Sequence, residues 1–295
     1  MKKISKSRII FQIFNYSILF VMMFICVYPL IYVLFASFSD PQRLITHSGF
    51  LFAPLGFTLK GYELVFKTND IYIGYGNTIF YVIVGTTVSV LLTLIGGYCL
   101  SRRNLLWKNA VMMMITFTMF FGGGLIPTFL LVENLGMVDT RWAMIIPSAI
   151  STYNLIIMRT AVSAIPYSLE EAARIDGAGN FTILFRIIAP LAVPTIAVMI
   201  LFYAFAKWNS WFEPMIYLRS RNLFPLQTFL RELLITNDLR QVSDETMLRD
   251  VTTTDLNKEL VQYSTVIVAT LPMLVIYPFL QKYFAKGVMI GAVKG

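Results

Sequence analysis

The residue types that most often carry catalysis are scarce in this chain. His47 is the only histidine, and the two cysteines, Cys26 and Cys99, lie in long apolar runs without the spacing of metal ligands. Neither the phosphate loop G-x-x-x-x-G-K-[ST] nor the fingerprint G-x-G-x-x-G occurs. We therefore expect no catalytic residue, no metal site and no cofactor bound by this chain, and we expect any ATP to be bound by another protein.

One polar segment has a pattern that could carry mechanism: P-Y-S-L-E-E-A-A-R-I-D-G-A-G-N-F, beginning at Pro166. Ser168, followed three residues later by Glu171, forms a capping box, which predicts a helix start. Gly177 supplies the left-handed residue that ends such a helix, and Asn180 can cap a second helix. The segment therefore predicts a short helix, a turn and another helix.

This predicted helix combines small residues, two adjacent carboxylates and exposed apolar side chains. Such a surface needs a partner, and a helix of this kind is suited to a groove of another protein. The alternative is a helix lying on lipid head groups. Anionic lipids favour Lys and Arg, whereas this helix begins with Glu170 and Glu171.

The elements that must position this segment are strongly apolar. The chain is 57% hydrophobic and 14% charged, against about 45–50% and about 25% in soluble domains. Six long runs lack Asp, Glu, Lys and Arg, although the fourth has only 17 residues (142–158). Because about 20 helical residues cross a bilayer, we expect an all-α polytopic membrane protein of one domain, 1–295, with spans at approximately 12–38, 74–100, 109–132, 141–160, 187–207 and 260–281.

The basic residues predict the orientation of these spans. With the N-terminus inside, the interior segments hold 13 basic residues and three acidic ones, Glu170, Glu171 and Asp176. The exterior segments hold 11 basic and 13 acidic residues, and seven of those basic residues lie in one long loop, which counts little. We therefore expect both termini inside. The net charge of +8 is then an orientation signal, and no nucleic-acid partner is expected.

The polar segment resembles the E-A-A-x3-G-x9-I-x-L-P loop of bacterial ABC importer permeases. The matching positions are E-A-A at 171–173, Gly177, Ile187 and Pro190, with Ala189 where the pattern has Leu. The D-G-A triplet at 176–178 is similar to the form found in carbohydrate importers. The resemblance extends over nearly the whole chain, including G-G-G-L-I-P at 122–127 and the tail 287–295, which is similar to that of the maltose and complex-oligosaccharide group.

This resemblance implies the type I ABC importer permease fold, with a cytoplasmic coupling helix in the loop 166–186. The chain would be a membrane-spanning, non-enzymatic subunit in the bacterial plasma (inner) membrane. The implied partners are a second permease subunit, a cytoplasmic ATPase dimer that binds ATP and magnesium, an extracellular or periplasmic solute-binding protein and an oligosaccharide. The implied ATPase-coupling residues are Ser168, Glu170, Glu171, Ala172, Ala173, Asp176, Gly177 and Ala178.

Two regions are candidates for substrate handling. In related sugar importers the exterior loop, here 212–259, reaches into the opened binding protein; the alternative is a solvated linker. Sugars are commonly held by aromatic faces and hydrogen-bonding side chains, so the candidate path residues are Tyr153, Asn154, Trp208, Asn209 and Trp211. For the two tryptophans an interfacial aromatic belt is the favoured interpretation, whereas Asn154 is expected to face another helix or the pore.

Two other functions remain as alternatives. An ABC importer permease for a non-sugar solute is excluded only by the resemblance. An ion-coupled secondary transporter would need ionisable residues within its spans, and the six runs contain no Asp, Glu, Lys or Arg.

Overall fold

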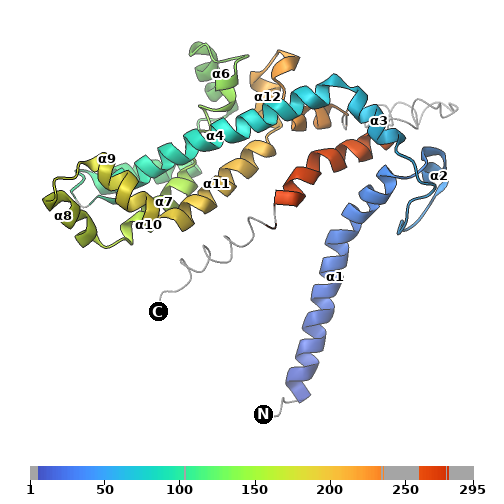
Figure 1. Cartoon of the computed structure of the whole chain (residues 1–295), viewed down its shortest axis with the longest axis horizontal. Coiled ribbons are helices and arrows are strands. Elements are labelled where there is room, and N and C mark those ends of the chain that lie inside the picture. The colour runs from blue at the N-terminus through green and yellow to red at the C-terminus, as the bar shows by residue number, and fades with distance from the viewer. Residues whose placement is uncertain (1–5, 103, 234, 236–258, 277, 279–295) are drawn as a thin grey trace. The chain divides into compact units, whose positions relative to one another are not determined.

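The computed structural model describes residues 6–102, 104–233, 235, 259–276 and 278 (Figure 1). Half of the predicted exterior loop (234 and 236–258) and the tail 287–295 lie outside these residues. Within them the chain is helical, and its one β-contact is an isolated bridge between Ser39 and Phe57. The chain divides into two compact units, Met1–Asn69 with Glu232–Leu271, and Asp70–Arg231 with Pro272–Gly295, each described here by itself.

The first unit contains the N-terminal helices α1 (Lys6–Ser37), α2 (Pro41–Thr46) and α3 (Lys60–Lys67), together with the greater part of the helix Glu259–Ile276. The Asp40 carboxylate caps α2 by accepting the backbone N–H groups of Gln42 and Arg43. Ala36, Leu44 and Leu51 form a small core where α1 ends. The apolar length of α1 is exposed, as expected of a helix that contacts lipid or another subunit.

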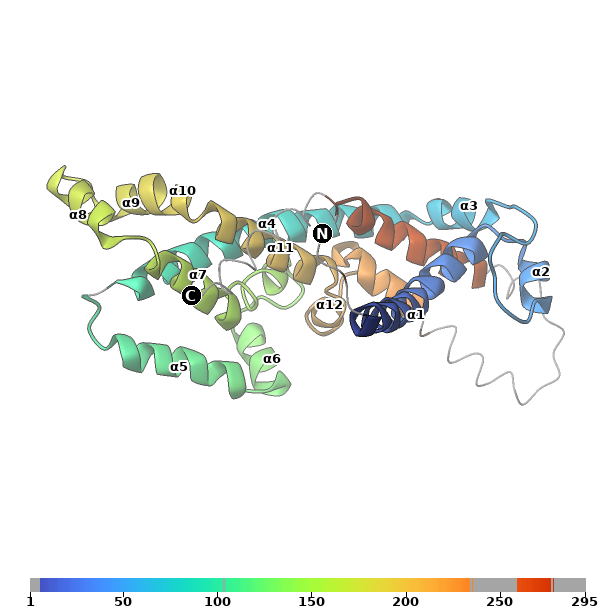
Figure 2. The same cartoon turned by 90° about the horizontal axis from the view of Figure 1, so that it is seen from below.

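The second unit is built on the long helix α4 (Asn69–Ser101), and α7 and α11 pack along it (Figures 1 and 2). Its other elements are α5 (Lys108–Phe120), α6 (Leu125–Asn134), a 3-10 turn (Arg141–Met144), α7 (Thr152–Ser163), α8 (Tyr167–Ile175), α9 (Asn180–Ile183), a π-helical turn (Leu184–Ile188), α10 (Ala189–Leu191), α11 (Val193–Trp208), α12 (Phe212–Tyr217) and a 3-10 turn (Arg221–Leu223). The core includes Leu94, Met158, Met199 and Tyr203.

Two glycines allow α7 to approach α4 closely. A Cβ on Gly97 would lie 2.7 Å from Cγ of Met158 and 3.1 Å from the backbone nitrogen of Arg159, and one on Gly96 would lie 2.9 Å from Leu155. The small residues thus let two helix backbones pack at a distance that larger side chains would prevent, as is common between membrane helices.

Three helices are long and apolar enough to cross a membrane: Arg8–Ser37, Asn69–Ser101 and Glu259–Ile276. Two bent pairs also qualify if each is one span. They are α5 with α6, with a bend of 112° between them, and the helical stretch Asn180–Leu191 with α11, with a bend of 85°. Figure 2 shows the sharp bend between α5 and α6. The described residues thus contain up to five spans by length and composition.

The region 141–160 differs from the single helix expected there. It contains a 3-10 turn, an irregular stretch around Pro147, and α7, which begins only after its N-cap Ser151. The twelve residues of α7 rise about 18 Å, which is well short of the ~30 Å hydrocarbon layer. Proline cannot donate a helical hydrogen bond, and the Ser151 hydroxyl accepts one from the backbone of Asn154, so the helix starts late.

Candidate functional site

The predicted helix–turn–helix is present as α8 and α9, beside the C-terminal end of α4 (Figure 1). Its start differs from the capping box that the sequence predicts. Pro166 is the N-cap residue of α8 and forms no side-chain cap, and Ser168 lies exposed within the first turn. Proline fixes φ at a value that suits a helix entry, so the helix begins before Ser168 can cap it.

The C-terminal end of α8 has the predicted left-handed stop. Gly177 has a φ of +81°. Its N–H donates to the carbonyl of Arg174 at 3.0 Å, and the N–H of Ala178 donates to the carbonyl of Ala173 at 2.9 Å. These are the two hydrogen bonds of a Schellman motif, which satisfy carbonyls at the end of the helix. The prediction for Gly177 is therefore confirmed.

Asn180 does not cap α9 as expected. It is the first helical residue, Gly179 is the N-cap, and no side-chain cap forms. The Asn180 amide oxygen instead accepts a hydrogen bond from Arg174 Nη2 at 3.1 Å. An arginine on α8 thus connects the two short helices across the turn, and this competing donor occupies the oxygen that a cap would need.

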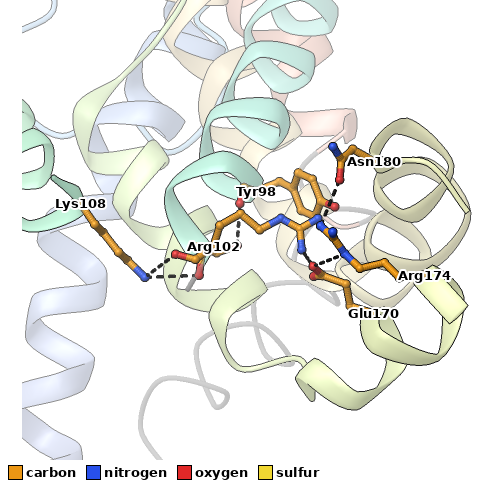
Figure 3. Close-up of polar contacts among 7 residues, drawn as sticks. Tyr98, Arg102, Lys108, Glu170, Arg174 and Asn180 are labelled. Atoms are coloured by element: carbon orange, nitrogen blue, oxygen red, sulfur yellow. Dashed lines mark hydrogen bonds and ion pairs between the residues drawn. The ribbon is translucent and has the colours of Figure 1, made fainter. Parts of the chain in front are cut away.

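The two adjacent carboxylates of α8 point in different directions. Glu171 is exposed, whereas Glu170 is only 6% exposed, and its Oε1 contacts the guanidinium of Arg102 and, at 3.5 Å, Nε of Arg174 (Figure 3). The Arg102 guanidinium also lies 3.8 Å above the ring of Tyr98. The expectation of a carboxylate pair free for a partner is therefore wrong for Glu170, because a buried charge needs a partner within the fold.

Burial shifts both members of this ion pair towards their neutral forms. It raises the pKa of the Glu170 carboxyl, and the charge of Arg174 opposes that rise. It also lowers the pKa of the Arg102 guanidinium, and the like charge of Arg174 adds to that decrease. For both groups burial is the larger cause, because a charged group away from water loses its hydration.

The remaining coupling candidates divide by exposure. Ala173 is buried against the core of the second unit and Ala178 is partly buried, whereas the exposed candidates are Ser168, Glu171, Ala172, Asp176 and Gly177. Two large apolar side chains that are not part of the motif are also strongly exposed: Ile175 is 85% exposed and Phe181 is 74% exposed. Their helical positions beside a glycine turn are the sequence signal that could have identified them.

Basic side chains close the C-terminal end of α4, where helical carbonyls lack partners. Lys108 Nζ donates to the carbonyls of Ser101 at 3.3 Å and Arg102 at 3.2 Å, and Arg159 Nε donates to that of Leu100 at 3.2 Å. In the sequence, Lys108 and Arg159 count only as basic residues that predict the orientation of the spans. In the structure they also join α5 and α7 to the end of α4, beside a pocket of about 60 Å³ that Arg102 and Glu170 line.

The candidate path residues lie at the start of α7 and at the end of α11. Asn154 and Trp208 are buried, and Tyr153 is exposed. Trp208 packs edge-on against Tyr75 at 6.4 Å, so its ring is part of the helix packing. The side chain of Asn209 donates to the carbonyl of Phe205 in its own helix.

Trp211 lies beyond the end of α11, as the N-cap residue of α12, and is partly exposed. The Arg231 guanidinium lies 4.1 Å from the centre of its ring. A sugar face would have to displace or share this cation.

Lys207 is a buried cation at the end of the predicted span 187–207, although it is counted among the exterior charges. It lies in α11 and is 7% exposed, and Nζ donates to the carbonyl of Met144 at 2.7 Å and to Oγ of Ser148 at 2.6 Å. Gly85 of α4 allows its stem to pass, since a Cβ there would lie 3.1 Å from Cε. No ion pair to Lys207 occurs in the part of the chain that the structure describes. The feature of the sequence that could have indicated this burial is that Lys207 directly follows the uncharged run 187–206.

Replacing Lys207 with methionine is expected to destabilise the protein by about 1–3 kcal/mol. Methionine keeps most of the side-chain volume but removes both hydrogen bonds that join α11 to the irregular stretch 144–148. The thermal unfolding midpoint in detergent measures the effect. Lys60→Met, at an exposed lysine, is the control, and equal midpoints for the two variants would contradict the prediction.

The first part of the predicted exterior loop is folded onto α4. Asn77 Nδ2 donates to the carbonyl of Asn222 at 2.7 Å, Tyr81 OH donates to that of Leu223 at 2.8 Å, and Thr78 Oγ1 accepts the N–H of Leu226 at 2.9 Å. The interpretation as a solvated linker is therefore wrong for residues 212–231. Residues 236–258 lie outside the described part of the chain.

The other residues singled out by type have ordinary surroundings. His47 lies in a loop, where Nε2 contacts the carbonyl oxygen of Phe50 at 3.3 Å. Cys26 and Cys99 are both exposed free thiols. Among the residues that the structure describes, no cluster of three or more His, Cys, Asp or Glu is arranged to hold a metal ion.

Comparison with known proteins places this arrangement in a family. Residues 89–290 match the model of the binding-protein-dependent transport system inner membrane component family. The chain belongs to this family. The membership agrees with the ABC importer permease that the E-A-A segment predicts, and it makes this permease a transport subunit of the inner membrane and not an enzyme.

Curated relatives cover nearly all of the permease. It is 39% identical to the polygalacturonan/rhamnogalacturonan transport system permease protein of Bacillus subtilis, over 98% of this chain and all of that protein. It is 28% identical to the arabinooligosaccharides transport system permease protein of Halalkalibacterium halodurans, over 92% of each chain.

A solved structure confirms the permease-like helical fold. The permease matches a chain of a bacterial ABC transporter involved in the import of the acidic polysaccharide alginate with a TM-score of 0.85, at 31% identity, covering 96% of this chain and all of that one. A second chain, from an alginate ABC transporter in complex with its pentasaccharide-bound periplasmic protein, matches with a TM-score of 0.55 at 16% identity, which supports the fold alone.

Proposed function

We propose that this permease forms, with a second permease subunit, the translocation path of an ATP-driven importer for acidic oligosaccharides delivered by an extracellular binding protein. The observation that carries the proposal is α8, a short helix with the E-A-A pattern, a Schellman turn at Gly177 and exposed apolar side chains beyond it. The acidic class of substrate is supported by the names of two similar proteins, which concern polygalacturonan and alginate.

The proposed topology has six spans with both termini in the cytoplasm. Three long helices and two bent pairs supply up to five crossings, and α7 with the irregular stretch before it would supply the remaining one. The end of α4 next to α8 gathers Arg102, Lys108, Arg159 and Arg174. Basic residues are enriched on the cytoplasmic side of membrane proteins, so this cluster favours an interior position for α8.

In the proposed complex α8 docks into a groove of a cytoplasmic ATPase. Ile175 and Phe181 are exposed apolar side chains of the kind that anchor a helix in such a groove. Glu171 and Asp176, also exposed, would face basic residues of the partner. An anionic lipid surface would be repelled by the same two carboxylates.

Replacing Ile175 with aspartate is expected to weaken ATPase binding by about 30-fold or more, because a central apolar anchor typically contributes at least 2 kcal/mol. The side chain is 85% exposed, so the change should leave the permease fold intact. Co-purification of the ATPase subunit with the permease pair measures the effect. Ile175→Leu keeps the apolar contact and is the control. Undiminished ATPase binding by Ile175→Asp would refute the docking surface.

The substrate class is tested by uptake into proteoliposomes that contain both permeases, the ATPase dimer and external binding protein. We expect oligogalacturonides to be taken up in an ATP-dependent manner and neutral malto-oligosaccharides of equal length to be taken up much more slowly. Uptake only of a non-sugar solute would support the alternative permease function. Uptake that stops when an ionophore collapses the ion gradients, with ATP present, would support a secondary transporter.

A further inference from the structure

We propose that the ion pair between Glu170 and Arg102 is the link through which movement of α8 is transmitted to α4. Both are assigned as positioning residues, which act by fixing α8 to the helix that is proposed to move. This inference rests on the proposed docking of α8 to an ATPase, and it assigns to Glu170 a task different from docking.

The first observation is that Glu170 is turned away from the surface that a partner would meet. Its side chain points towards Arg102 (Figure 3). It is 8% exposed and that of Arg102 is 16% exposed, whereas the neighbouring Glu171 is exposed. Adjacent residues of a helix point about 100° apart, so one carboxylate of α8 can face its own protein while the next faces a partner. The sequence alone does not distinguish the two.

The second observation is that each end of the pair is held by further contacts. Arg102 is positioned by the ring of Tyr98, one turn earlier on α4, at 3.8 Å. Glu170 also contacts Arg174, whose guanidinium donates to Asn180 at the start of α9. The pair therefore connects the last turn of α4 to both short helices of the loop, and neither side chain can move alone without breaking these contacts.

The third observation is that the end of α4 is itself a junction. Lys108 of α5 and Arg159 of α7 donate to its last carbonyls, at Ser101 and Leu100, and Lys108 also donates to that of Arg102, the residue that follows α4. A displacement of α8 that pulls on Arg102 would therefore be shared by α4, α5 and α7. Chains of hydrogen bonds and ion pairs between rigid helices can carry coupling between distant sites, and this junction provides such a chain.

Breaking the pair is expected to separate ATP hydrolysis from transport without preventing docking. We expect Glu170→Gln and Arg102→Gln each to lower oligogalacturonide uptake per ATP hydrolysed by about tenfold or more, within the usual range of coupling between sites. The double variant should be no worse than the poorer single variant, because the two residues act through one contact. The complete complex in proteoliposomes is the system, and ATPase co-purification is measured alongside.

The outcomes separate this inference from the proposed docking. Retained ATPase binding with decreased uptake per ATP in Glu170→Gln supports the link. Unchanged uptake per ATP in that variant overturns it, and so does loss of ATPase binding, which would make Glu170 a docking residue. The matched control is Glu133→Gln, at an exposed glutamate of α6 outside the loop 166–186, which should keep the ratio of uptake to hydrolysis. Retained ATPase binding by Ile175→Asp would refute docking instead, whatever Glu170→Gln does.

A covalent replacement keeps the test decisive if the glutamine variants do not fold. Cysteines are placed at both positions, Glu170→Cys and Arg102→Cys, in a chain with Cys26→Ser and Cys99→Ser, and are joined by a short bifunctional methanethiosulfonate. The bridged protein should recover uptake per ATP, and reduction of the bridge should remove it again. Equal ratios before and after bridging would overturn the proposed link.

Discussion

Replacing Gly177 with proline is expected to reduce ATP-dependent uptake to background. Gly177 has a φ of +81°, whereas proline is confined to φ near −65°. Proline also removes the N–H that donates to the carbonyl of Arg174. The turn that ends α8 and redirects the chain into α9 cannot form, so Ile175 and Phe181 would no longer be presented together. Uptake and ATPase co-purification by the variant complex are the measurements.

Two milder changes at Gly177 separate backbone geometry from steric contact. A Cβ added there meets no atom within 4 Å, so alanine carries only the conformational cost of a left-handed residue, about 1–2 kcal/mol. Asparagine tolerates this conformation better and should keep most of the activity. The expected order of uptake is glycine, asparagine, alanine, proline. Uptake by Gly177→Pro at the wild-type rate would contradict the assignment of the turn.

Replacing Gly97 with leucine is expected to have the largest effect on stability. The first added carbon would already lie 2.7 Å from Met158 and 3.1 Å from the backbone nitrogen of Arg159, and Met158 is fully buried. Because the obstacle includes helix backbone, α7 would have to move away from α4. We expect the free energy of unfolding to decrease by about 3 kcal/mol or more, the upper end of the usual cost of overpacking. This corresponds to a decrease of roughly 5–10 °C in the unfolding midpoint.

Gly76→Leu is the matched control because Gly76 lies in the same helix and a Cβ there meets no atom within 4 Å. Thermal unfolding of both variants in the same detergent, together with the fraction that elutes as a monodisperse peak, provides the comparison. If Gly97→Leu unfolds at the same temperature as Gly76→Leu, the close packing of α4 and α7 is refuted.

These predictions all concern places where one residue serves two helices. Gly177 joins α8 to α9, Gly97 lets α4 meet α7, and Lys207 ties α11 to the stretch before α7. Contacts of this kind fix which helices move together when a protein changes conformation. The ion pair of Glu170 and Arg102 would extend the same principle to the helix that is proposed to contact the ATPase.

The sequence predicted the helical class because long runs without charge can satisfy their backbone in lipid only as helices. It predicted the turn at Gly177 because glycine reaches a left-handed conformation that other residues rarely adopt. It did not predict the late start of α7 or the bend between α5 and α6. At both places the apolar composition favours one continuous helix, whereas Ser151 before α7 and the glycine run 122–124 between α5 and α6 favour an interruption. Only the packing of the surrounding helices determines which of the two occurs.

What the sequence alone determined, then, is local: the apolar runs, the turn at Gly177 and a helix with the E-A-A pattern, each set by the conformational limits of neighbouring residues. The tertiary structure decided which side chains of that helix face inward. Glu170 and Glu171 are the same residue type at adjacent positions. Arg102, 68 positions before Glu170 in the chain, binds Glu170, whereas Glu171 is exposed. The physical reason is that a buried charge is costly unless an opposite charge lies beside it, and residues far apart in the sequence come together only when helices pack.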